Sequence, residues 1–305
     1  LVTPRREPSH AGRPRIRVGF VAAGTAILLA GIGITPFTPL LSSDGPLGAA
    51  APSLGLGAPK AAAASLADVA RLASARPALV VGAGQFEHVR YVDTQVTDAA
   101  TGSQTLTIIH ETYVASDGWT WRQDLQSGSG DATSFYMLYH PDKVPAGRLP
   151  TDPAALEQAL RARSSGTASA DQSLFKELGE IALAGTASAE LRAASIHVMQ
   201  AMADRPAITQ PARKGGTTTP RVSVAQETID GSATVRATFT DLSQPGNGTV
   251  AYWFDAQTSE ILRYAITGPS VEFRSDYQVR ALVDALPSAL TDVLGTTRVH
   301  REVQQ

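Results

Sequence analysis

The chain has 305 residues, of which 43% are hydrophobic and 18% charged, an ordinary composition for a globular protein. Its net charge of −2 creates no long-range field that would attract nucleic acid, so we expect no nucleic-acid partner. The absence of cysteine excludes disulfide bonds and lipid attachment through an N-terminal cysteine.

The first predicted element is an uncharged apolar run over residues 18–41. As a helix, the part before Pro36 would nearly match the roughly 30 Å hydrocarbon core of a bilayer. Residues 1–17 carry many arginines and one acid, a bias that keeps a segment in the cytoplasm. We therefore predict a cytoplasmic basic head over 1–17, a transmembrane helix over 18–41 and an extracytoplasmic body held at the cell membrane. The alternative is a signal peptide cleaved near Gly48-Ala49-Ala50, which would leave the body secreted.

The rest of the chain changes its periodicity twice. Residues 42–64, rich in Ala, Pro and Gly, predict a tether, and Ser65 caps a short helix that ends before Pro77. Helical and alternating patterns then follow. Strands are predicted over 85–93, 105–115 and 119–122, a strand or short helix over 134–139, helices over 153–163, 171–184 and 188–203, and strands over 221–229, 232–241, 249–255, 260–267 and 270–280. This order predicts an α+β domain with an antiparallel sheet over 65–285 and a tail over 286–305.

Four local patterns line up in one order along the body. They are the hairpin patterns at 84–90 and 111–118, the segment LPTDPAAL at 149–156, and YWFD at 252–255. With the single span and the tether, they resemble an uncharacterised family of actinobacterial membrane-anchored proteins, some encoded beside extracytoplasmic sigma-factor genes. The resemblance implies no established activity. It does imply the half-barrel of lipoprotein carriers and of periplasmic sigma-E regulators, a curved antiparallel sheet with helices packed on its concave face.

The sequence offers weak signals for catalysis. His110-Glu111 begins like a zinc-protease motif, but Val114 stands where the second histidine is needed and the segment is predicted as a strand. Gly128-Ser129-Gly130 lacks the flanking strand and helix of a nucleophile elbow. We therefore predict no catalytic residue, no metal site and no cofactor.

Aromatic side chains form the candidate binding site. Trp119 and Trp121 lie two apart, so on one strand they would share a face. The other candidates come from separate strand-like segments: Tyr136, Tyr139, Trp253 and Tyr264. On a curved sheet these rings would wall an apolar cavity for a lipid or a hydrophobic peptide, whereas the alternative is that they fill the core.

These observations favour a membrane-anchored extracytoplasmic binding or sensor module over other function classes. Its expected ligand is an apolar molecule or a membrane-associated regulatory protein, with a link to envelope-stress signalling. Two alternatives stay open: a structural or interaction domain whose core is filled, and a cell-envelope enzyme with an unrecognised site.

Overall fold

The computed structural model describes residues 65–99, 102–127, 133–140, 149–163, 169–211, 216–243, 248–268 and 271–304, which belong to one compact unit. The predicted head, span and tether lie outside these residues, so membrane anchoring stays a prediction. Within the described ranges, none of the helices combines the length and apolarity that a bilayer crossing needs.

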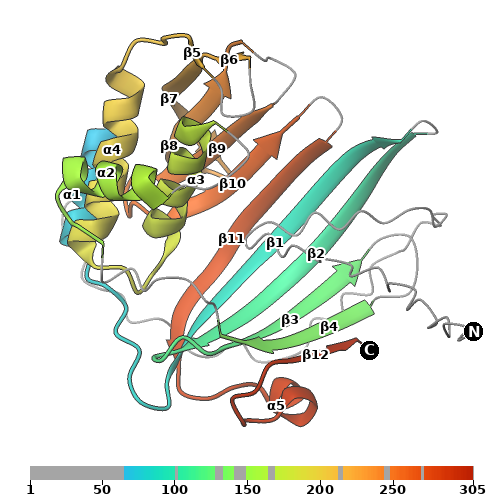
Figure 1. Ribbon diagram of the computed structural model, residues 1–305. Coiled ribbons are helices and arrows are strands. Elements are labelled where there is room, and N and C mark those ends of the chain that lie inside the picture. Colours follow the sequence, from blue (N-terminus) through green and yellow to red (C-terminus); the bar gives the residue numbers. More distant parts are fainter. Residues whose placement is uncertain are drawn as a thin grey trace, which may run out of the picture. The chain divides into compact units, whose positions relative to one another are not determined.

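Ten strands form one antiparallel sheet in the order β12-β4-β3-β2-β1-β11-β10-β9-β8-β7 (Figure 1). Their bounds are β1 Phe86–Ala99, β2 Gly102–Ala115, β3 Thr120–Ser127, β4 Thr133–Tyr139, β7 Pro220–Ile229, β8 Ser232–Asp241, β9 Thr249–Asp255, β10 Ile261–Thr267, β11 Val271–Val283 and β12 Arg301–Gln304. Two short strands, β5 Gln210–Pro211 and β6 Thr217–Thr218, pair separately. The order begins at β12 and ends at β7, so the described strands do not close into a barrel.

The helices between the two groups of strands lie within one residue of their predicted positions. They are α2 Pro153–Arg163, α3 Ala170–Leu183 and α4 Ala189–Asp204, preceded in the chain by α1 Leu66–Ala75. Serine caps explain where three of them begin: the hydroxyls of Ser65, Ser169 and Ser188 accept hydrogen bonds from backbone amides three residues further on. The predicted α+β class is thus confirmed.

The strand register separates the sheet into two faces, because residues paired across antiparallel strands point to the same side. On one face, α1, α3 and α4 pack against β8, β9 and β7. The core there joins Phe175 of α3 to Phe239 and Tyr252 of the sheet. Figure 1 shows α1–α4 gathered over the β7–β10 part of the sheet, while β1–β4 extend beyond them.

The C-terminal residues differ from the predicted tail. Residues 288–294 form α5, and β12 pairs with β4 at the edge of the sheet. Leu290 and Leu294, one helical turn apart, pack with Trp121, Tyr136 and Leu138 in a second core. The register places this core on the face opposite α1–α4, so helices pack on both faces of the sheet, whereas the prediction placed them on one face alone.

Candidate functional site

The face that carries α1–α4 on β7–β9 continues onto β1–β4, and none of the described helices α1–α4 forms a layer over it there (Figure 1). We call this region the His110 face and define it by the cross-strand register. It comprises Val89, Tyr91, Asp93 and Gln95 of β1, Leu106, Ile108, His110, Thr112 and Val114 of β2, Arg122, Asp124 and Gln126 of β3, and Phe135, Met137 and Tyr139 of β4.

A paired charge cluster occupies the centre of this face. His110 is only 2% exposed, and both its ring nitrogens meet carboxylates. Its Nδ1 lies 2.6 Å from Asp124 Oδ1 and its Nε2 lies 2.9 Å from Asp93 Oδ2. Arg122 Nε donates to Asp124 Oδ1 at 2.6 Å, and the Ser275 hydroxyl of β11 donates to Asp93 Oδ1 at 2.5 Å. When the imidazole is protonated, two cations and two carboxylates balance one another inside the cluster.

The electrostatics of the cluster favour a charged imidazole. Burial by itself lowers the pKa of His110, but the hydrogen bonds to Asp124 and Asp93 outweigh it, so the pKa is raised above its ordinary value. The Arg122 guanidinium, 2.7 Å from Nδ1, opposes this rise. Burial also acts to raise the pKa of Asp124, yet its bonds to His110 and Arg122 lower it overall. These contacts therefore favour the imidazolium form of His110 and the carboxylate form of Asp124.

Apolar side chains surround the charged centre. Ile108 and Leu106 continue along β2, and Phe135 and Met137 lie on β4; all four are half-buried. Tyr91 stacks on His110 with ring centroids 4.4 Å apart. A partly exposed apolar surface around a paired charged centre can hold an amphipathic molecule, because the apolar part of that molecule would remove the remaining exposed area of these side chains from water.

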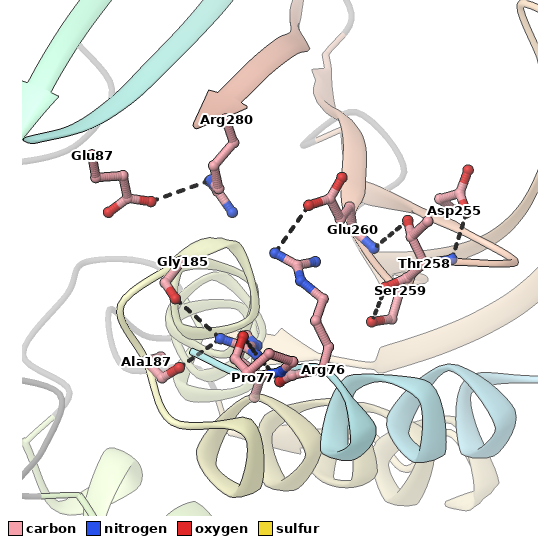
Figure 2. Close-up of polar contacts among 11 residues, drawn as sticks. Arg76, Pro77, Glu87, Gly185, Ala187, Asp255, Thr258, Ser259, Glu260 and Arg280 are labelled. Carbon is pink, nitrogen blue, oxygen red and sulfur yellow. Dashed lines mark hydrogen bonds and ion pairs between the residues drawn. The ribbon is translucent and has the colours of Figure 1, made fainter. Parts of the chain in front are cut away.

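A second charged cluster ties the beginning of β1 and the end of β11 to the helices (Figure 2). Glu87 Oε1 lies 3.3 Å from Arg280 Nε, and Arg76 pairs with Glu260 at 3.0 Å. Beside them, the guanidinium of Arg192 donates to four backbone carbonyl oxygens, those of Arg76, Pro77, Gly185 and Ala187. Burial raises the pKa of Glu87 against the opposing charge of Arg280. Arg192 thus fixes the α3–α4 turn against the end of α1, and the Arg76–Glu260 pair joins that end of α1 to the residue before β10.

Comparisons with known proteins give distant likenesses. No family model matches the chain, and no curated protein matches it either. Among solved structures, it is similar to MucB of Pseudomonas aeruginosa in complex with MucA, at 11% identity and a TM-score of 0.28 over 73% of this chain. It is also similar to a putative outer membrane lipoprotein-sorting protein domain from Vibrio parahaemolyticus (9% identity, TM-score 0.27, 75% of this chain and 97% of that one).

A third similar structure is the Mycobacterium tuberculosis lipoprotein LppX, at 12% identity and a TM-score of 0.24 over 70% of this chain and 94% of that one. The match to the MucA-bound MucB chain spans only 59% of that chain. At such TM-scores these likenesses carry no argument about the site. The actinobacterial family suggested by LPTDPAAL likewise stays a prediction, since no family model supports it.

The six aromatic candidates do not share one face. Trp121 and Tyr136 fill the core under α5, where Trp121 Nε1 donates to Gly295 O at 3.1 Å. Trp119 packs against the same core and contacts the rings of His140 and His300.

The other three candidates are dispersed. Tyr139 lies on the His110 face, and Tyr264 packs against the helical core, stacked on Tyr252 at 4.9 Å. Trp253 points to the opposite face, where its Nε1 donates to Glu227 and Arg236 lies over its ring. The structure does not bring the six aromatic side chains together in one cavity wall.

Sequence reasoning missed the cluster that the structure assembles. Asp93, His110 and Asp124 come from three strands and are separated by 14 to 17 residues, so no local motif joins them. The usable signal was a charged residue at an alternating position of each of three adjacent predicted strands. Among the described residues, no group of three or more His, Cys, Asp or Glu side chains is placed to hold a metal ion.

Proposed function

We propose that this domain is a non-catalytic binding module that holds an amphipathic ligand, with its apolar part against the His110 face. The supporting observation is the set of half-buried apolar side chains around a fully paired charge cluster, on a region that the α1–α4 layer leaves open. An amphipathic lipid or a hydrophobic peptide satisfies these requirements, because its polar end can hydrogen-bond near Asp93, Arg122 or Tyr139.

The chemistry of the cluster favours binding over catalysis. The Ser275 hydroxyl is used as a donor to Asp93, and His110 has both nitrogens occupied, so neither acts as an activated nucleophile or a free base in this arrangement. We therefore infer that the chain is not an enzyme. The absence of a free general base distinguishes this arrangement from a Ser-His-Asp triad, in which the histidine faces the serine.

We further propose that the sheet works as a half-barrel carrier tethered to the cell membrane through residues 18–41, with its body outside. In that setting the module would report a bound envelope component to a membrane-associated regulatory protein, which fits an envelope-stress circuit. The alternative of a structural domain with a filled core draws support from Trp121 and Tyr136, which are both buried under α5.

Native mass spectrometry of the full chain, exported and purified under mild conditions, tests the proposal. We expect an additional mass on the protein, which solvent extraction would release and identify as a lipid or a hydrophobic peptide. A clean mass of the chain alone, after incubation with extracted envelope lipids, would contradict ligand binding and favour the structural alternative.

A further inference from the structure

The edge strand β7 carries a second feature, independent of the His110 face. β7 is the last strand of the sheet, and among the described strands its only partner is β8. It is ten residues long and pairs with β8 without a bulge. A long, regular edge leaves backbone N–H and C=O groups that can pair with another chain.

Two adjoining cavities open along this edge, with volumes of about 300 and 550 Å³. The larger is lined on one side by the consecutive residues Arg221, Val222, Ser223 and Val224, and on the other by the end of α4 and residues 205–207. Successive side chains of a strand point to opposite faces. A cavity that contacts four consecutive residues therefore lies against the edge of the strand, where its backbone is accessible.

The smaller cavity supplies an apolar seat beside the same edge. Its lining includes Met202, Val222 and Phe239, which are at most 7% exposed, and Ile208, which is 64% exposed. An apolar side chain of a segment laid along β7 would fit against these residues. The backbone edge and the seat together suit an extended peptide better than a lipid, because a lipid chain cannot satisfy the backbone groups.

The charges around the cavities indicate the chemistry of that peptide. Arg161 and Arg205 pair with Glu157, Arg161 also pairs with Asp171, and Asp204 accepts from Gln200. Arg221 is exposed, and its guanidinium has no hydrogen bond or ion pair with any described residue. The complement to this single unpaired cation is a carboxylate.

We propose that the edge of β7, which no described strand other than β8 pairs with, receives an extended, acid-bearing segment of a partner protein as an additional strand of the sheet. Backbone hydrogen bonds to β7 would supply affinity. The apolar seat and Arg221 would set which sequences bind, one through a buried side chain and the other through an aspartate or glutamate.

An array of synthetic ten-residue peptides tests the proposal on the full chain. In each peptide Val and Thr alternate, and one Asp, Asn or Lys is moved along the sequence. We expect Asp peptides to bind about fivefold more tightly than their Asn counterparts, the effect of one half-exposed ion pair, and Lys peptides to bind least. Arg221→Glu should reverse this order, whereas Arg298→Glu, which changes an exposed charge near the opposite edge strand β12, should not.

Backbone methylation of the best peptide separates strand addition from side-chain binding. N-methyl groups on one alternating set of amides should abolish binding and those on the other set should not, because every second amide of an added strand faces β7. Amide hydrogen exchange of β7 should slow at alternating residues when the peptide is present. Equal effects of the two methylated sets, no preference for Asp, or a dimer of this chain that the peptides do not dissociate would overturn the proposal.

Discussion

The charge on His110 controls how the stability of the domain depends on pH. Its pKa is raised in the folded state above the ordinary value of 6.5. The imidazolium therefore contributes its full stabilisation below about pH 6.5, and this contribution is lost as the pH rises through the folded pKa. Asp124 acts in the acidic range, because its pKa is lowered in the folded state. Its carboxylate contributes full stabilisation above the ordinary pKa of 3.8, and this contribution is lost as the pH falls through the folded pKa.

Replacing His110 by glutamine should remove the alkaline part of this dependence. We expect His110→Gln to lower the free energy of unfolding by about 1.5–3 kcal/mol at pH 6, because Asp93 and Asp124 lose their shared cation. The difference from the wild type should shrink toward pH 9. Urea denaturation at pH 6, 7.5 and 9 measures it, with the exposed His197→Gln as control. A difference that is constant with pH would show that folding does not raise the pKa of His110.

At the scale of elements, α3 lies directly on the sheet because Gly179 has no side chain. A Cβ at this position would lie 2.0 Å from Cζ of Tyr252. The buried Tyr252 ring thus occupies the space that any larger residue on the helix would need. Glycine in the middle of a helix costs helix propensity, and here the close approach of helix and strand accounts for it.

Gly179→Ala should therefore destabilise the domain although alanine is the better helix former. We expect a loss of about 1–3 kcal/mol from overpacking against Tyr252. Ser173→Ala on the same helix should change the free energy of unfolding by no more than about 0.5 kcal/mol. Thermal denaturation of both variants measures the contrast, and a stabilised Gly179→Ala would mean that α3 does not sit this close to β9.

The α3–α4 turn is held in place by hydrogen bonds from the side chain of Arg192. Its buried guanidinium satisfies carbonyls from two separate segments, 76–77 and 185–187, so its removal leaves several acceptors unpaired. Arg192→Ala should cost about 3 kcal/mol or more, and Arg192→Lys should recover only part because an ammonium cannot reach all four oxygens. Arg163→Ala, which breaks an exposed pair with Glu177, should cost under about 1 kcal/mol. Equal losses from Arg192→Ala and Arg163→Ala in denaturant titrations would refute this role.

The elements were predictable where local signals agree. Ser65 and Pro77 bound α1, and a leucine- and alanine-rich periodic pattern defines α4, because capping and periodicity act within a few residues. Residues 286–305 carry only a seven-residue helix and a four-residue strand, too short for a periodic signal. The α5–β12 segment is ordered by contacts with Trp121 and Leu138, which are distant in sequence.

At the scale of the whole domain, the sequence could not assign the faces of the sheet. Alternation in β2 predicts that Ile108 and Ile109 point to opposite sides, but it does not say which side carries the helices. For the same reason, the sequence could not show that the aromatic candidates lie apart. Trp253 and Tyr264 are both typical strand residues, yet the register places them on opposite faces of the sheet. The His110 cluster escaped prediction because it needs the pairing of β1 with β2 and of β2 with β3 at once.

Two neighbouring residues of β2 test the central proposal most directly. Ile108 lies on the His110 face between Asp93 and Gln126, whereas Ile109 lies on the opposite face between Val92 and Leu125. Both are half-buried, so aspartate at either position should cost comparable stability.

The measurement is a titration of the full chain with a fatty acid that carries a dansyl fluorophore, with circular dichroism to verify that each variant is folded. We expect saturable binding to the wild type, binding weakened by at least about tenfold in Ile108→Asp because a buried charge would face the ligand, and unchanged binding in Ile109→Asp. Equal binding by both folded variants, or no binding by the wild type, would contradict the assignment of the His110 face as the ligand surface.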